Sequence, residues 1–307
     1  MNIVQLTKEL IKELRDPGHL FLRVIHHSPA LFQWLDDESY LNLCFRITMG
    51  RKLDLENPRT FNEKIQWLKL NKREDIFTTI VDKYEVKQYI AERIGTEYII
   101  PTLGIWNRFD DINFDELPDQ FVLKCTHDSG GLIICKDKSK LNLNWARKRI
   151  NRSLKKDFYL VGREWPYKAV QPRIIAEPYM EDAQEKELRD YKFFCFDGYV
   201  DNVMLAMDRD SGDPKFYFFN QNWELMRLNI RGKNAPTDFT LPKPKGIDQM
   251  FQLAAELSKG IPFVRVDLYY CNGKIYFGEM TFFPQSGFDA NLLRETDEYL
   301  GNIIKLH

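Results

Sequence analysis

The chain has 307 residues, with 44 basic and 45 acidic side chains and a formal charge of −1. A chain of this length buries roughly 75% of the surface that its unfolded form exposes, so it needs neither disulfides nor a structural metal to fold. The balanced charge provides no basic footprint for a phosphate backbone, which argues against nucleic acid as a partner.

The spacing of the cysteines and histidines argues against a protein that binds metal through Cys or His. The five cysteines stand far apart in or beside apolar runs, and the five histidines lack the spacing of a zinc site. We therefore expect reduced structural thiols and no metal held by Cys or His.

The N-terminus alternates charged and apolar residues and lacks the features of a secretory signal, which predicts a cytoplasmic protein. The apolar stretch 20–35 is too short for a membrane span and contains Arg23 and Pro29. A helical core segment is favoured here, and peripheral membrane attachment stays open as the alternative.

Residues 1 to about 80 are predicted to be helical. Thr60 and Glu63 form an S/T-x-x-E capping box, and Phe61, Ile65 and Leu68 follow on one helical face. No nucleotide-binding fingerprint is visible in this region.

The middle of the chain mixes helices and strands. A helix is predicted to open at Asp82-Lys83 and to stop at Gly95. Two apolar runs, 121–125 and 131–135, predict a hairpin around a small-residue loop. A basic helix at about 143–156 and a strand over 173–180 come next.

The region after Asp190 is predicted to be mostly strands. Asp197-Gly198 indicates a hairpin turn, and a strand is expected over 215–220. A helix over 247–258 then leads into two strands joined by Asn272-Gly273, which is the strongest short hairpin signal in the chain.

The register of this last hairpin determines how closely two carboxylates approach each other. If Asn272-Gly273 is the turn, Cys271 pairs with Lys274, and Asp267 falls one position from a direct pairing with Glu279. A bulge or a slight offset would bring the two carboxylates together.

Carboxylates in such apolar strands are costly unless they are paired or bind a cation. Arg265 lies two residues before Asp267 and shares its strand face. A structural ion pair and a metal site are therefore both open interpretations of Asp267 and Glu279.

Two lysines favour a phosphate site. Lys124 lies inside an apolar strand and needs an anion, and adjacent glycines in the loop 127–131 allow backbone N–H groups to approach phosphate oxygens. Lys83, in the first turn of its predicted helix, opposes the helix dipole, which suggests another role. Taken alone, either lysine is more often a solvated side chain.

The order of these features along the chain resembles the order of motifs in the ATP-grasp superfamily. Within it, six stretches resemble the teichuronopeptide-biosynthesis (TupA-like) type found among bacterial surface-polysaccharide genes, and the resemblance runs from about residue 50 to the C-terminus. The stretches are NPRTFNEKIQWLK, DKYEVKQYI, LPDQFVLKCTHDSGG, IIAEPYM, DYKFFCFDG and FGEMTFFPQSG. The resemblance implies an α+β fold in which two lobes, 81–178 and 179–307, sandwich ATP after a helical region 1–80.

The resemblance also assigns roles to residues. Pro178 would offer its carbonyl, and Met180 its N–H, to adenine. Asp182 or Glu187 would take the ribose hydroxyls. The implied ATP-binding residues are Lys83, Lys124, His127, Ser129, Gly130, Gly131, Glu177, Pro178, Met180 and Asp182. The implied catalytic residues are Asp190, Lys192 and Arg265, and the implied magnesium ligands are Asp267, Glu279 and Thr281.

Two features depart from the usual pattern. Thr281 stands where related ligases usually have Asn, and a hydroxyl is a weaker magnesium ligand than an amide carbonyl, so one or two Mg²⁺ ions remain possible. Many ATP-grasp ligases begin with an α/β domain, whereas this chain is predicted to begin with helices, so their acceptor recognition does not transfer.

The implied activity is ATP-dependent amide formation through an acyl phosphate, with ATP and Mg²⁺ as cofactors. The carboxylate would be a uronic acid of a capsular or cell-surface polysaccharide or its precursor, and the amine an amino acid or amino alcohol. The basic helix would attract an acidic glycan, although a solvated helix face is the more usual explanation of such a run. Its cations are Arg147, Lys148, Arg149, Arg152, Lys155 and Lys156.

Two other classes compete with this hypothesis. Asp208-Arg209-Asp210 is a D-x-D sequence, as in metal-dependent glycosyltransferases, but the residues that follow it favour a polar turn. A non-catalytic ATP-binding module is the other alternative, and Thr281 is its support.

Overall fold

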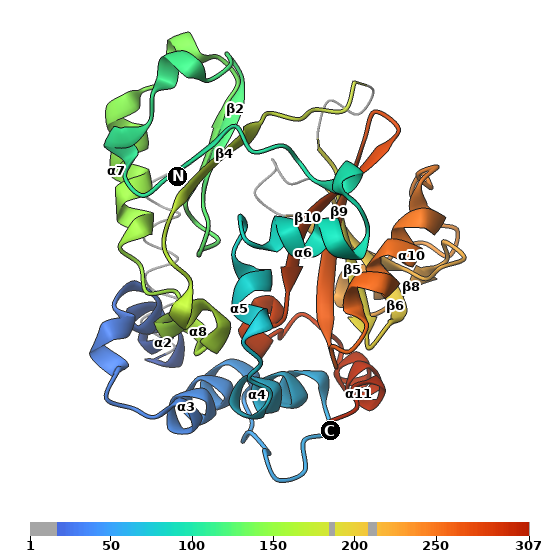
Figure 1. The fold of residues 1–307 in the computed structure, drawn as a ribbon. Coiled ribbons are helices and arrows are strands. Elements are labelled where there is room, and N and C mark those ends of the chain that lie inside the picture. Colours follow the sequence, from blue (N-terminus) through green and yellow to red (C-terminus); the bar gives the residue numbers. More distant parts are fainter. Residues whose placement is uncertain (1–16, 184–187, 208–213, 307) are drawn as a thin grey trace, which may run out of the picture.

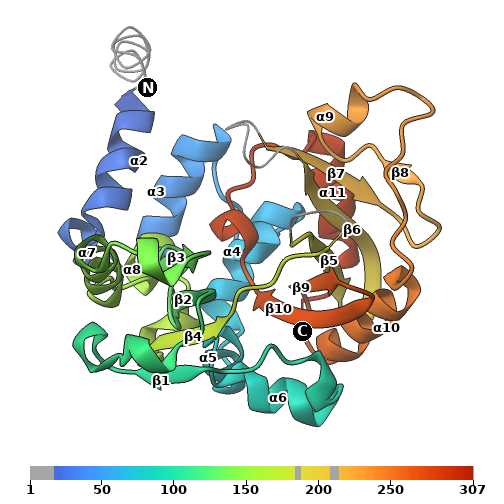
Figure 2. The same cartoon turned by 90° about the horizontal axis from the view of Figure 1, so that it is seen from above.

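The computed structural model describes residues 17–183, 188–207 and 214–306. It contains a four-stranded sheet of order β1-β4-β2-β3 and a six-stranded sheet of order β10-β9-β5-β6-β7-β8, and all strand pairs are antiparallel. The expected α+β class is confirmed. Helices α5 and α6 lie beside the region where the two sheets approach each other (Figures 1 and 2).

The described N-terminal part is helical, as expected. Its helices are α2 Pro17–His27, α3 Asp37–Met49, α4 Phe61–Asn71, α5 Ile76–Val81 and α6 Val86–Arg93. Thr60 and Glu63 make both hydrogen bonds of the capping box that starts α4. The prediction that a helix opens at Asp82-Lys83 was wrong, because α6 begins at Val86 and Lys83 lies in the turn before it. The Asp82 carboxylate accepts from the N–H groups of residues 84 and 85 and fixes this turn.

The four-stranded sheet is built from β1 Gly104–Trp106, β2 Phe121–Cys125, β3 Leu132–Cys135 and β4 Ile174–Pro178. Helix α7, Leu143–Leu154, packs on it by burying Ala146 and Ile150 against the strand side chains. The expected hairpin of β2 and β3 is confirmed, with Lys124 opposite Leu132.

The six-stranded sheet holds the largest core. Its strands are β5 Asp190–Phe196, β6 Tyr199–Met207, β7 Lys215–Phe219, β8 Leu225–Met226, β9 Val264–Cys271 and β10 Lys274–Thr281. Helix α10, Ile247–Ser258, packs on it with Phe251 against Phe193. Phe61 and Ile65 of α4 belong to the same core, and Phe61 contacts Phe194 and Phe263.

Short elements connect these layers. The remaining α-helices are α8 Tyr159–Gly162, α9 Ile230–Lys233 and α11 Arg294–Ile303. The 3-10 helices are η1 Pro29–Phe32, η2 Thr96–Tyr98, η3 Phe109–Asp111, η4 Phe114–Glu116, η5 Lys138–Lys140, η6 Trp165–Ala169 and η8 Pro284–Gly287.

The last hairpin has the predicted register. Asn272 and Gly273 form the turn with φ values of 50° and 79°, the left-handed conformation that two-residue hairpin turns require. Lys274 pairs with Cys271, and a bulge after Phe277 places Glu279 opposite Asp267. The bulge therefore puts the two carboxylates side by side on one face of the sheet.

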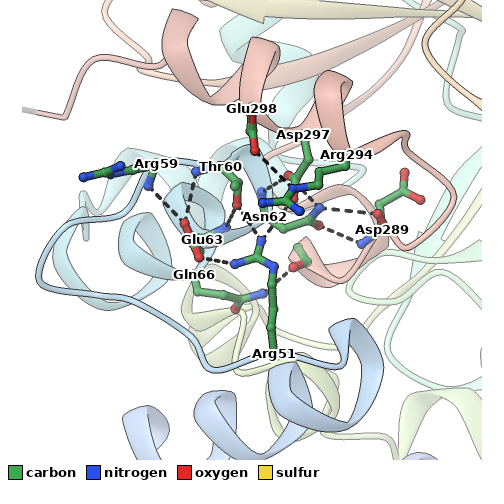
Figure 3. Close-up of polar contacts among 11 residues, drawn as sticks. Arg51, Arg59, Thr60, Asn62, Glu63, Gln66, Asp289, Arg294, Asp297 and Glu298 are labelled. Atoms are coloured by element: carbon green, nitrogen blue, oxygen red, sulfur yellow. Dashed lines mark hydrogen bonds and ion pairs between the residues drawn. The ribbon is translucent and has the colours of Figure 1, made fainter.

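A polar network joins the start of α4 to the C-terminal part of the chain (Figure 3). Asp297 of α11 accepts hydrogen bonds from the Asn62 backbone at 2.9 Å, the Asn62 amide at 2.8 Å and Arg51 at 3.1 Å. The Asn62 side-chain oxygen accepts from the N–H of Asp289 at 2.7 Å. This network ties the segment after β10 to α4.

Replacing Asp297 with Ala is expected to lower the free energy of unfolding by about 3 kcal/mol, because two buried donors of Asn62 and one guanidinium lose their acceptor. The matched control is Glu298→Ala, which removes the neighbouring exposed carboxylate and should cost less than about 1 kcal/mol. Urea denaturation measures both. Equal losses in the two variants would contradict the role given to the network.

The lobe boundaries remain a proposal. All four strands of the first sheet fall within 104–178, and those of the second within 190–281.

The five cysteines are buried and free, which confirms their expected structural character. Among the described residues, no helix combines the length and apolarity that a membrane span requires.

Candidate functional site

A cavity of about 230 Å³ lies where β2, β4, β9 and β10 approach one another. Its polar lining residues are Lys83, Lys87, Lys124, Asp128, Ser129, Glu177 and Glu279. Its other lining residues are Ile99, Ile100, Cys125, Gly131, Leu132, Tyr269, Phe277 and Gly278. The cavity thus combines cations, carboxylates and an apolar wall.

One side of the cavity carries three lysines. Lys124 and Lys87 each lie 2.6 Å from a different oxygen of Glu177. Burial alone would raise the pKa of Glu177, but these two lysines hold it below its usual value. The anion that Lys124 was expected to need is therefore Glu177. Lys83 donates to the backbone oxygen of Asp128 at 2.5 Å, which joins the turn before α6 to the glycine loop.

The glycine loop is fixed from inside. The Asp128 carboxylate accepts from the N–H of Gly131 at 2.9 Å and from the Ser153 hydroxyl of α7. A Cβ at position 131 would lie 2.5 Å from both Cys125 Sγ and Ser153 Oγ, so only glycine fits there. His127 is buried, and this burial lowers its pKa.

The opposite side carries one of the paired carboxylates, because Glu279 lines the cavity and its partner Asp267 does not. Arg265 Nη2 lies 2.7 Å from Asp267 Oδ2, 3.0 Å from Glu279 Oε1 and 3.1 Å from Thr281 Oγ1. Lys192 contacts Asp267 and lies 2.6 Å from Asp190. The ion pair with Arg265 that the sequence left open is present, and it joins all three implied metal ligands.

The local environment shifts the pKa values of Asp267 and Glu279 in opposite directions. Burial raises the pKa of Asp267 to about 6, against the lowering effects of Arg265 and Lys192. Burial would also raise the pKa of Glu279, but Arg265, Lys83 and Lys192 together keep it below its usual value. Lys83 and Glu279 line the same cavity, so the lysine side and the carboxylate side share one space.

These residues supply oxygen donors of the kind that a magnesium ion takes. Three oxygen-bearing side chains already converge on one cationic nitrogen, and Glu279, whose side chain is 44% exposed, reaches the cavity. Within the described residues, no three His, Cys, Asp or Glu side chains form a metal-binding group. Mg²⁺ needs no such cage, since it commonly takes one or two carboxylates together with substrate phosphates and water.

Other implied ATP-binding residues lie outside the cavity lining. His127, Gly130, Pro178 and Met180 do not line it. Asp182 accepts from the backbone N–H of Asn272 at 2.7 Å and so holds the segment between the sheets against the turn of the last hairpin. Its alternative for the ribose, Glu187, lies outside the described residues.

The sequence reasoning missed several lining residues. Lys87 is the clearest case, although it lies four residues after Lys83, a spacing that puts both side chains on one face of the helix predicted to open at Asp82-Lys83. Tyr269 and Phe277 were also missed. The register places them on opposite faces of the sheet, since Phe277 pairs with Leu268 and Tyr276 with Tyr269, so strand alternation alone does not predict that both line one cavity.

The segment after β10 is held by a buried lysine. Lys69 is fully buried and donates to the backbone oxygens of Gly162 and Ser286 at 2.7 Å each. Gln285 and Ser286 both have φ near 50°, a strained conformation for residues with a Cβ. Burial lowers the pKa of Lys69 from 10.5 to about 8.

Lys69 should make stability depend on alkaline pH. Between pH 8 and 10.5 the unfolded chain binds this proton more tightly than the folded chain, so the free energy of unfolding should rise with pH across this window, by up to about 3 kcal/mol. Urea denaturation of the wild type and of Lys69→Met at several pH values measures the effect. A difference between the two proteins that stays constant over this window would contradict it.

Two antiparallel sheets that meet at a cavity, with lysines on one and paired carboxylates on the other, form the arrangement of an ATP-grasp protein. Comparison with family models bears this out, since the model described as TupA-like ATPgrasp matches residues 63–305. The chain belongs to the TupA-like ATP-grasp family. The ATP-grasp class comprises ADP-forming carboxylate–amine ligases that use ATP and Mg²⁺.

Solved structures with a similar fold share little sequence with the chain. D-alanine–D-alanine ligase from Helicobacter pylori has a TM-score of 0.43 at 15% identity, over 80% of this chain and 69% of that one. The ligase of that name from Bacillus anthracis, complexed with ATP, has a TM-score of 0.45 at 16% identity, over 74% and 65%. D-cycloserine synthetase DcsG has a TM-score of 0.40 at 15% identity, over 87% and 79%. No curated protein matches the chain.

Proposed function

We propose that this protein is an ADP-forming ligase that joins a uronic acid carboxylate to the amine of an amino acid or amino alcohol. The observation that carries the proposal is the pair of charged walls of one cavity, with Lys83 and Lys124 on one side and Glu279, whose strand partner is the buried Asp267, on the other. Such a pair suits a polyphosphate and its metal, because each wall neutralises one of them.

The residues of the chain have separable tasks in this proposal. Lys83 and Lys124 hold phosphate oxygens, and Ser129 with the loop glycines supplies a hydroxyl and backbone N–H groups. The apolar wall of Ile99, Tyr269 and Phe277 covers the adenine ring. Glu177 holds Lys124 and Lys87 in place. Burial lowers the pKa of Lys87, and the charge of Glu177 opposes this effect.

Arg265 and Lys192 prepare the transfer itself. Arg265 orients Asp267 and Glu279, and Lys192, whose pKa rises under the opposing charge of Asp267 although burial acts to lower it, stays protonated near the transferred phosphoryl group. Asp267, Glu279 and Thr281 would hold Mg²⁺, which supplies charge neutralisation at the phosphates. The reaction transfers the γ-phosphoryl group to the carboxylate, and the amine then displaces phosphate from the acyl phosphate to leave the amide, ADP and phosphate.

The substrate assignment rests on the family. We assign the carboxylate to a capsular or cell-surface polysaccharide or its precursor. Because ATP is consumed and the five cysteines are free thiols, we place the reaction in the cytoplasm.

An ADP-release screen tests the proposal. It crosses uronic acids and UDP-uronates with amino acids and amino alcohols, and each positive pair is checked by mass spectrometry for the amide. ADP release that requires both partners is expected. Sugar transfer from a nucleotide sugar without ATP would instead support the glycosyltransferase alternative, whose sequence Asp208-Arg209-Asp210 lies outside the described residues. ATP binding without ADP release from any pair would favour a non-catalytic module.

A further inference from the structure

Helix α7 carries a second candidate binding surface, on the outer side of the glycine loop. A hollow of about 310 Å³ is lined there by Gly130 of the loop and by six side chains of the α7 region. These are Trp145, Lys148, Arg149, Arg152, Ser153 and Lys156, and we refer to the surface that they form as the basic hollow. In Figures 1 and 2, α7 lies along the four-stranded sheet, away from the six-stranded one.

Three cations of the basic hollow have no ion-pair partner in the part of the chain that the structure describes. Among the described residues, no carboxylate forms an ion pair with Lys148, Arg152 or Lys156, whereas Arg147 on the same helix lies 3.0 Å from Asp110. Trp145, which is 51% exposed, lines the same hollow as these cations. A face that only contacts solvent would not need an exposed aromatic side chain at this place. Concentrated positive charge beside an exposed indole is a combination that binds anions with an apolar face.

The basic hollow is also built onto the phosphate loop. Arg149 donates to the backbone oxygen of Leu132 at 2.9 Å and to that of Gly130 at 3.4 Å, so its guanidinium is held at the loop. A Cβ on Gly130 would lie 3.3 Å from Lys156 Nζ, which places this ammonium at the loop tip. Ser153, between them on α7, contacts the Asp128 carboxylate inside the loop. One short loop thus separates this surface from the proposed ATP site.

We propose that the basic hollow is a subsite for an acidic sugar chain, in which uronate carboxylates pair with Lys148, Arg152 and Lys156 and a pyranose ring packs on Trp145. This inference rests on the proposed function, since it makes the acceptor an oligomer held outside the reacting position. The hollow, at about 310 Å³, has a size that suits a short stretch of sugar residues. A nucleic acid duplex is a poorer ligand, because the chain has a net charge of −1 and therefore no general excess of cations to follow a phosphate backbone.

Calorimetric titration of the full chain with an oligogalacturonate tests the subsite, with a neutral dextran of equal length as the comparison ligand. The variant Lys148→Gln/Arg152→Gln/Lys156→Gln should bind the oligogalacturonate about tenfold more weakly and with a smaller salt dependence, because several exposed ion pairs are lost together. The control Lys155→Gln/Lys245→Gln/Lys274→Gln removes the same charge from exposed positions outside the hollow and should bind like the wild type. Trp145→Ala should weaken binding several-fold without changing the salt dependence.

Two results would overturn the subsite. One is equal binding by the hollow and control variants. The other is tighter binding of duplex DNA than of the oligogalacturonate, with the same dependence on the three cations. The proposed function fails separately: ADP release from monomeric uronate and amine is measured on the same proteins and should be unchanged in the hollow variant. Wild type that releases no ADP with any pair counts against the ligase, whereas active protein with unaltered oligomer binding in the variant counts against the subsite alone.

Discussion

Replacing Glu279 with Gln is expected to reduce ADP formation at least about a hundredfold while leaving the fold intact. The amide keeps the shape of the carboxylate but loses the negative charge that the proposed Mg²⁺ requires. It also leaves Arg265 with Asp267 as its remaining carboxylate partner. ADP release under saturating ATP gives the effect on turnover, and calorimetric titration with Mg²⁺-ADP gives the effect on binding.

The control for this variant is Glu256→Gln. Glu256 lies on α10 and pairs with the exposed Lys259, so it carries the same chemical change away from the cavity. It should retain normal turnover, and the thermal midpoints of both variants should stay within a few degrees of the wild type. Near-normal ADP release by Glu279→Gln would remove Glu279 from the metal site and leave it as a structural partner of Arg265.

Replacing Arg265 with Met is expected to lower the free energy of unfolding by about 3–5 kcal/mol. The Asp267 side chain is only 2% exposed and receives two hydrogen bonds from Arg265, at 2.6 and 2.7 Å. Without Arg265, Lys192 is the one cation among the described residues that still contacts this buried carboxylate. Urea denaturation at neutral pH measures the loss.

A double variant separates charge from packing at this position. Arg265→Met/Asp267→Asn removes both charges and should recover much of the loss, because the penalty of the single variant comes from an uncompensated buried carboxylate. Arg265→Lys keeps the charge without the planar fork and should fall between the wild type and Met. Losses that are equal in the single and double variants, or smaller than about 1 kcal/mol, would show that the ion pair is not what holds this group.

The sequence determined most of what is local in this protein. The capping box of α4 and the Asn272-Gly273 turn depend on neighbours within a few residues, and both were predicted correctly. The pairing of Asp267 with Glu279 followed from the same turn, because a hairpin register propagates from its turn and a single bulge corrects it. The order of motifs along the chain also indicated the family that the comparison confirmed.

Only the tertiary structure decided which charges meet. Glu177 became the partner of Lys124 and Lys87 because β4 pairs with β2 and α6 packs beside them, and these residues are far apart in sequence. The basic run on α7 divided into a cation paired with Asp110 and a group beside Trp145 once the helix had packed on its sheet. Local propensities act over a few residues, whereas the partners of buried and surface charges depend on how separate elements pack, and no short-range pattern in the sequence specifies that packing.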